Sequence, residues 1–74
     1  MTNNELINAI ETANITDAVI DELINFEWEY DPYGIIDFFG GHIDDPGVRD
    51  RVRTEVIYRL NNEKDVLIDE LRTA

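Results

Sequence analysis

Apolar residues recur every three to four positions along most of this 74-residue chain. That period predicts amphipathic helices whose apolar faces pack together. Thr or Asp at capping positions, two Asp-Pro pairs and one Gly-Gly pair mark where segments begin and end. The pattern predicts one all-α domain over residues 1–74, a small bundle of four or five helices at about 3–13, 17–29, 32–39, 46–60 and 63–72.

The last two segments also fit one continuous helix, because Leu67 and Leu71 fall in phase with Val56 and Leu60. Asn61-Asn62 favours a break instead, and both arrangements stay open. A continuous helix over 46–72 would be about 40 Å long, so its far end would need a partner such as a second copy. We therefore expect the apolar stripe of this region to carry self-association into a homodimer. The stripe consists of Val48, Val52, Val56, Leu60, Leu67 and Leu71.

Residues 26–41, FEWEYDPYGIIDFFGG, hold most of the aromatic side chains and no base. If the second helix continues through them, Phe26 and Tyr30 lie on its buried face, Trp28 turns to the acidic face and Glu27 turns inward. The alternative is an extended segment after Asn25. We favour the helix, with Trp28 partly exposed, because an isolated strand would leave its backbone groups unpaired.

The large apolar side chains of this stretch have two expected roles. We expect most of one group to fill the core, since little else in the chain is large enough: Phe26, Ile35, Ile36, Phe38 and Phe39. Trp28, Tyr30 and Tyr33 alternate with carboxylates and have polar tips, which suits a half-buried rim. Because Tyr and Trp dominate binding hot spots, these three are the expected anchors of an interface.

The net charge of −11 is unevenly placed. Residues 1–48 contain eleven acids and no Lys or Arg, whereas residues 49–74 contain six acids and six bases. Such self-repulsion destabilises a compact chain, so it indicates a use for the charge. The lack of a basic surface argues against direct binding of nucleic acid or of anionic membranes.

Several kinds of chemistry lack their usual residues. Cysteine and serine are absent, so a disulfide, a thiolate metal site and two common nucleophiles are excluded. His42 with Asp37, Asp44 and Asp45 is the one group that resembles a metal site, but a loop with a helix-capping Asp45 explains it better. We expect no catalytic residues, no cofactor and no metal. The absence of cysteine, of a secretory signal and of a membrane span favours the cytoplasm.

These observations predict a non-enzymatic interaction protein that binds a basic surface of a partner protein, such as a nucleic-acid-binding protein, and inhibits or regulates it. In general type it is similar to the DNA-mimic inhibitors of phages and plasmids and to acidic immunity proteins of toxins, with no shared motif. The expected partner-binding residues are Asp21, Glu22, Glu27, Trp28, Glu29, Tyr30, Asp31 and Tyr33.

The alternative is a self-assembling helical subunit whose acidity only keeps it soluble. One observation would remove the need for an external basic partner. This is internal pairing between the carboxylates of the first two helices and four arginines of the C-terminal region, Arg49, Arg51, Arg53 and Arg59.

Overall fold

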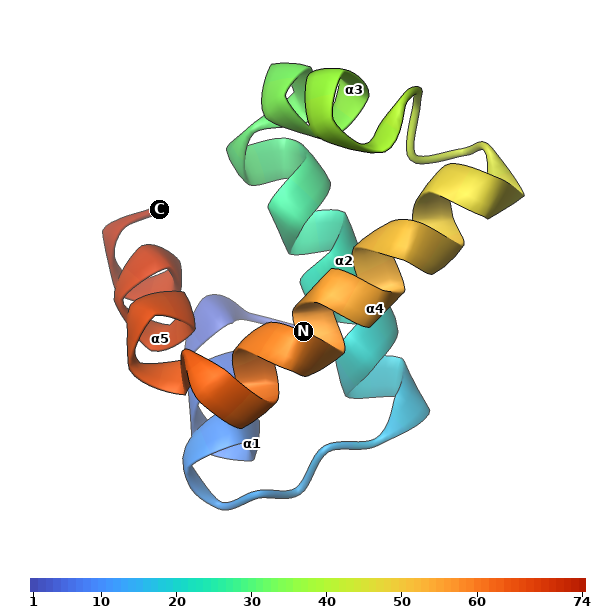
Figure 1. Cartoon of the computed structure of the whole chain (residues 1–74). Coiled ribbons are helices and arrows are strands. Elements are labelled where there is room, and N and C mark those ends of the chain that lie inside the picture. Colours follow the sequence, from blue (N-terminus) through green and yellow to red (C-terminus); the bar gives the residue numbers. More distant parts are fainter.

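Five helices and no strand make up the chain, which a computed structural model describes over residues 1–74. The helices are α1 (Asn3–Glu11), α2 (Asp17–Tyr30), α3 (Pro32–Phe39), α4 (Pro46–Asn62) and α5 (Lys64–Thr73) (Figure 1). The predicted all-α bundle is confirmed. None of these helices has the length and apolar content that a membrane span requires.

Side-chain caps begin four of the five helices. The Thr2 hydroxyl accepts from the Glu5 N–H, while the Glu5 carboxylate accepts from the Thr2 N–H, a reciprocal capping box. That backbone hydrogen bond lowers the pKa of Glu5 below its ordinary value. Thr16 caps α2 through the Val19 N–H, at 3.3 Å. These caps satisfy N–H groups that a helix start leaves unpaired.

The two Asp-Pro pairs begin α3 and α4 as the sequence predicts. Asp31 accepts from the Gly34 N–H at 3.0 Å, and Asp45 accepts from the Gly47 N–H at 2.8 Å. Gly34 allows this close approach, since a Cβ there would lie 2.3 Å from an Asp31 oxygen. α3 ends at Gly40, whose φ of 86° lies in the left-handed region that favours glycine.

Four helices end one or two residues from the predicted positions, and α5 begins one residue later than predicted. α1 ends at Glu11 and not at residue 13, and Ala13 adopts a left-handed conformation with φ of 56°. α4 and α5 are separate helices, so the alternative of one continuous helix is wrong. The break falls at Glu63, whose φ of −139° and ψ of 33° lie outside the helical region.

The core lies where four helices meet in pairs, α1 against α5 and α2 against α4 (Figure 1). α3 lies at one end of the molecule, beside the ends of α2 and α4. Seventeen apolar side chains form the core, and no polar or charged side chain is fully buried. Among the most deeply buried side chains are those of Leu23, Val52, Leu67 and Leu71, each at most 1% exposed.

The stripe predicted to carry self-association belongs to this core. Val48, Val52, Val56, Leu67 and Leu71 are at most 1% exposed, and Leu60 packs partly buried against them. Contact with α1 and α2 of the same chain already covers these side chains. The structure thus places this stripe in the core of a single chain and leaves only part of Leu60 exposed, so self-association through the stripe has little apolar area to use and stays a prediction.

A pair of neighbouring substitutions in α5 tests this assignment. Leu67→Ala should lower the free energy of unfolding by about 2–5 kcal/mol, because it leaves a cavity in a fully buried position. Val66→Ala, at a position 51% exposed, should change it by less than about 0.5 kcal/mol. Chemical denaturation measures both. If Leu67→Ala instead dissociates an oligomer in sedimentation experiments with little loss of stability, the side chain is an interface residue.

Candidate protein-binding site

α3 presents most of its apolar side chains to solvent. Tyr33 is 79% exposed, Phe38 83% and Ile36 40%, whereas Ile35 alone on this helix is fully buried. A short helix at the end of a bundle contacts its neighbours on one side only. Ile35 and Phe39, one turn apart, occupy that side, so the expectation that Ile36 and Phe38 fill the core is wrong.

The preceding turn of α2 adds to this surface. α2 continues through the aromatic stretch to Tyr30, as favoured, so the extended alternative is excluded. Phe26 is buried, but Tyr30, whose ring lies 5.6 Å from that of Phe26, is 49% exposed and not on the buried face as expected. Trp28 is partly buried against the core, with its ring 4.3 Å from the His42 ring.

We call this surface the α3 corner and define it by its exposed apolar side chains and its carboxylates. It comprises Glu29, Tyr30, Asp31, Tyr33, Ile36, Asp37 and Phe38. None of its three carboxylates forms an ion pair within the chain; Asp31 caps α3. The corner therefore combines uncovered aromatic rings with negative charge that no base of the molecule offsets.

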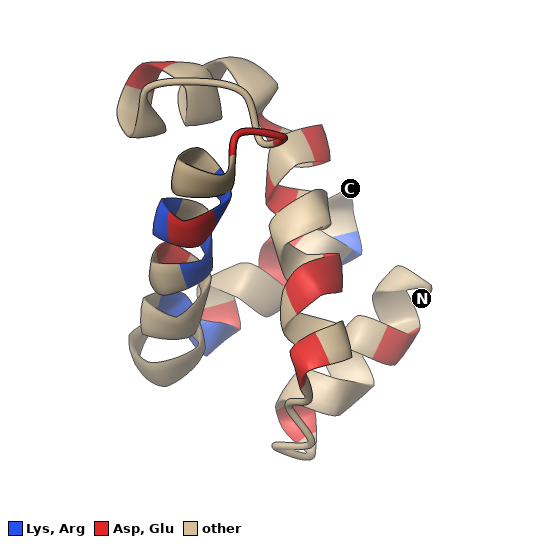
Figure 2. Ribbon diagram, turned by 90° about the vertical axis from the view of Figure 1, so that its right-hand side faces the viewer, with Lys and Arg blue, Asp and Glu red and all other residues tan.

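Most acidic residues of α2, by contrast, meet positive charge inside the molecule. Bases of α4 lie along the acidic side of α2, as Figure 2 shows. Arg53 pairs with Asp17 at 3.4 Å, and Arg49 lies 3.9 Å from Asp21. The N-terminal amine lies 3.6 Å from Glu22. These pairs are largely exposed, and such pairs contribute about 0–1 kcal/mol each.

Internal pairing between arginines of the C-terminal region and carboxylates of the first two helices is therefore present in part. Arg49, Arg53 and Arg59 each reach a carboxylate of α2, and Arg72 lies 3.9 Å from Glu11 of α1. The fourth named arginine, Arg51, instead donates two hydrogen bonds to the Phe39 carbonyl oxygen. Internal pairing therefore lowers the demand for an external cation along α2. The carboxylates of the α3 corner have no such internal partner.

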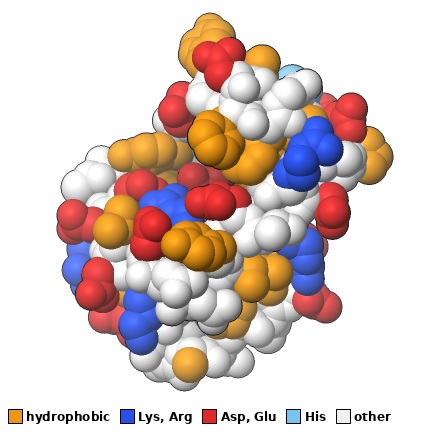
Figure 3. All heavy atoms as spheres, viewed as in Figure 1, with side chains coloured by type: hydrophobic (Ala, Val, Ile, Leu, Met, Phe, Trp, Pro, Cys, Tyr) orange, Lys and Arg blue, Asp and Glu red, His pale blue; other side chains and the backbone are white.

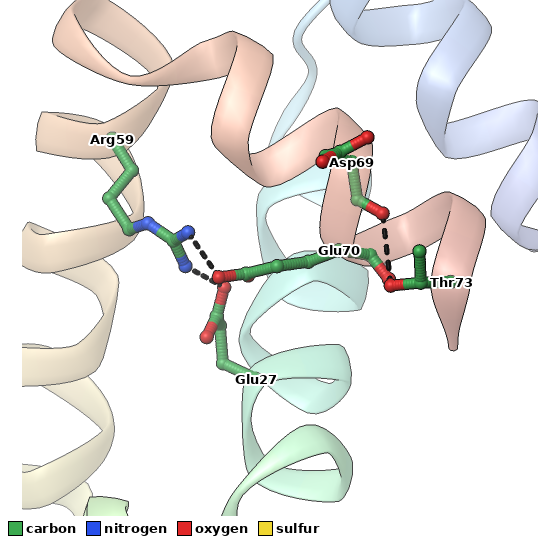
Figure 4. A network of polar contacts seen from close by, with 5 residues as sticks. All are labelled: Glu27, Arg59, Asp69, Glu70 and Thr73. Carbon is green, nitrogen blue, oxygen red and sulfur yellow. Dashed lines mark hydrogen bonds and ion pairs between the residues drawn. The ribbon is translucent and has the colours of Figure 1, made fainter.

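One guanidinium serves two largely but not fully buried carboxylates where α2, α4 and α5 meet. Arg59 of α4 donates to Glu27 of α2 at 2.5 Å and to Glu70 of α5 at 2.8 Å (Figure 4). The exposed fractions of the three side chains are 12%, 15% and 22%. The second oxygen of Glu70, Oε2, is buried and has no hydrogen-bond partner. The network therefore holds one more negative charge than positive.

Burial and the surplus of negative charge in this network both affect the pKa of Glu27. Burial raises the pKa of Glu27 to about 7, because desolvation disfavours the ionised form; Arg59 opposes the rise, while Glu70 and Glu55 add to it. Burial lowers the pKa of Arg59, but the hydrogen bond to Glu70 and the nearby carboxylates outweigh it and raise the pKa overall. Arg59 thus stays charged while Glu27 is partly protonated near neutral pH.

A groove of about 450 Å³ opens beside this network, between α3 and the region where α4 meets α5. We call it the acidic groove. Its wall combines five carboxylates with a single base, and α3 and α5 contribute apolar side chains. The lining residues are Glu27, Asp31, Gly34, Ile35, Phe38, Phe39, Glu55, Arg59, Glu63, Val66 and Glu70. In Figure 3 blue atoms ringed by red and orange lie in the hollow beneath the α3 lobe.

Residues 37–45 do not assemble a metal site. No group of three or more His, Asp or Glu side chains in the structure is arranged to hold a metal ion. Asp45 caps α4 as expected, and the His42 Nδ1 accepts a hydrogen bond from the Asp44 N–H at 3.1 Å. The His42 ring packs against Trp28, so its position is explained by ring stacking and a turn.

Sequence reasoning found part of this site. It placed Glu27 inward, and it predicted Tyr33 as an interface residue with Glu29 and Asp31 beside it, although Tyr33 is more exposed than the half-buried rim that was expected. It missed the acidic groove, because periodicity does not show which distant residues Arg59 meets. The available signal was the position of Arg59 and Glu70, each directly before a residue of the apolar stripe, Leu60 or Leu71.

Comparisons with known proteins leave the site to be judged on its geometry. No protein-family model, no curated protein and no solved structure matches the chain.

Replacing Glu27 tests the buried network. Because the pKa of folded Glu27, about 7, exceeds its ordinary value of 4.5, the folded state holds the proton more tightly. The free energy of unfolding then falls as pH rises between these two values. Glu27→Gln removes this loss, so between pH 5 and pH 8 the variant should gain about 2 kcal/mol relative to the unsubstituted protein.

Urea denaturation over this pH range measures the gain. Asp50→Asn, which removes one negative charge from an exposed side chain of α4 that is not among the groups shifting the pKa of Glu27, serves as the control and should follow the unsubstituted protein. Parallel stability curves for Glu27→Gln and the unsubstituted protein would show that Glu27 titrates normally.

Proposed function

We propose that this chain is a non-enzymatic binding protein that docks on a basic surface of a partner protein and so blocks or regulates it. The nucleic-acid-binding face of a partner protein is an example of such a basic surface. The observation that carries the proposal is the α3 corner, where Tyr33 and Phe38 are about four-fifths exposed beside carboxylates that no base of the chain pairs.

Exposure of such rings at one end of the molecule supports a contact surface. A monomeric protein normally covers large apolar side chains, and contiguous uncovered ones typify interaction sites. Tyrosine provides much of the energy of protein interfaces, since its ring buries a large area while its hydroxyl stays hydrogen-bonded. Arg and Lys of a partner can also stack on aromatic rings, which links the apolar and acidic parts of the corner.

The remaining charge supports a basic partner. The molecule carries −11 overall, and this field steers a positively charged surface toward the corner while it repels acidic proteins, nucleic acids and anionic lipids. The cysteine-free composition fits a reducing compartment, and we infer a cytoplasmic location from it.

The contact proposed here lies on α3 and the last turn of α2, and not along the rest of α2. Of the residues predicted to bind a partner, Asp21 and Glu22 meet internal positive charge, Glu27 is buried with Arg59, and Trp28 is partly covered. A free row of carboxylates along α2 that could imitate nucleic-acid phosphates is therefore not offered. The proposal rests on the other predicted residues, Glu29, Tyr30, Asp31 and Tyr33, together with exposed Phe38.

Two aromatic substitutions test the proposal. A partner is first captured from a lysate at low salt, purified, and titrated against the protein by calorimetry. Tyr33→Ala should then weaken binding at least about tenfold, as hot-spot residues do, without loss of stability. Tyr58→Ala, at an exposed α4 position outside the corner, is the matched control and should change affinity less than about twofold.

The salt dependence gives the second criterion, because affinity for a basic surface falls steeply as ionic strength rises. Salt-insensitive binding, or equal effects of Tyr33→Ala and Tyr58→Ala, would refute the proposal. A salt-stable homodimer that Phe38→Ala dissociates would favour the self-assembling alternative, formed at the α3 corner instead of the stripe predicted for it.

A further inference from the structure

The acidic groove contains more negative charge than its own base can offset. Arg59 is shared between Glu27 and Glu70, and the buried Oε2 of Glu70 has no hydrogen-bond partner. Glu55 of α4 and Glu63, between α4 and α5, line the same groove, and neither forms an ion pair. A cation bound at the wall of the groove would offset part of this surplus of negative charge.

The groove also has an apolar lining. Ile35, Phe38 and Phe39 contribute to it from α3 and Val66 from α5, and Phe38 and Val66 are more than half exposed. A small inorganic cation gains nothing from contact with apolar side chains. A lysine or arginine side chain gains from it, because its aliphatic stem packs on apolar surface while its charged head pairs with carboxylates. A ring such as that of Phe38 also attracts the cationic head.

A second copy of this chain does not fit the groove. Each copy carries a net charge of −11, so two copies repel one another. Lys64 is its one base that forms no ion pair or side-chain hydrogen bond, and it lies at the same junction between α4 and α5. Charge complementarity therefore selects a basic segment of a different protein.

We propose that the acidic groove receives one arginine or lysine side chain from a short basic, partly apolar segment of the partner protein. The stem of that side chain lies against Phe38 and Val66, and its head is paired by Glu55 and Glu63, beside the negatively charged network of Glu27 and Glu70. This inference rests on the proposed function, since it names the feature of the basic partner that is recognised. The exposed α3 corner and the groove share Phe38, so one segment contacts both.

A synthetic peptide provides a defined probe. It is an amphipathic helical peptide of Leu and Lys with one central Arg, and a second version carries citrulline, the neutral isostere of Arg, at that position. Glu55→Gln combined with Glu63→Gln should weaken binding of the Arg peptide about tenfold, equivalent to about 1.4 kcal/mol. Asp50→Asn combined with Asp69→Asn also removes two negative charges, but from exposed positions outside the groove, and it should weaken binding less than threefold.

The citrulline peptide completes a double-mutant cycle. It should bind the unsubstituted protein about tenfold more weakly than the Arg peptide does, but the Glu55/Glu63 double variant should not distinguish the two peptides. Calorimetry measures the affinities, and amide chemical shifts should change around Glu55, Glu63 and Glu70. Thermal unfolding of each variant shows that the fold is retained.

The outcomes separate this inference from the proposed function. If both double variants lose affinity equally and Tyr33→Ala still weakens binding, the α3 corner binds the basic segment and the groove inference is overturned. If the groove variants lose affinity selectively while Tyr33→Ala has no effect, the groove is supported and the corner is not. Failure of both peptides to bind at low salt would overturn both.

Discussion

One guanidinium placed between two largely buried carboxylates is the constraint on which the rest of this structure depends. Arg59 joins three helices, because its partners Glu27 and Glu70 come from α2 and α5 while it belongs to α4. Removing such groups from water is costly, and one positive charge cannot offset two negative ones in a region of low polarity. The molecule meets this imbalance by holding Glu27 partly protonated near neutral pH. The same imbalance gives the adjoining groove its attraction for a further cation.

Stability and recognition lie in different parts of the chain. α1, α2, α4 and α5 bury nearly all of the apolar core, and three of these four helices begin with a side-chain cap. α3 contributes the fully buried Ile35 and the partly buried Phe39, and its other large apolar side chains are exposed. A helix that adds so little to the core, yet carries several large apolar side chains, fits a role in contact with another molecule. The acidic groove beneath it extends that surface toward the buried network.

The helices and the core were largely predictable, because caps and helical periodicity depend on neighbouring residues. Thr2, Thr16, Asp31 and Asp45 marked four helix starts, and the periodic Val, Ile and Leu positions proved to be buried. The errors concern contacts between distant residues. Periodicity showed that Val56 and Leu67 needed cover but not that the same chain supplies it. Composition could not show that α3 has neighbours on one side only, which leaves Phe38 in solvent. Charge counting located the acids but not the reach of Arg49, Arg53 and Arg59 across to α2.

The central claim is that the buried network lacks positive charge and that a bound basic segment supplies it. The most direct measurement is a carboxyl-carbon NMR titration of Glu27, first in the free protein and then with the arginine-containing peptide bound. The groups that face Glu27 are Arg59 and Glu55 of α4 and Glu70 of α5, so an added cation is the main new influence on it. The account predicts a pKa of about 7 in the free protein that falls toward the ordinary value of a glutamate on binding. A normal pKa in the free protein, or a raised one that binding leaves unchanged, would contradict it.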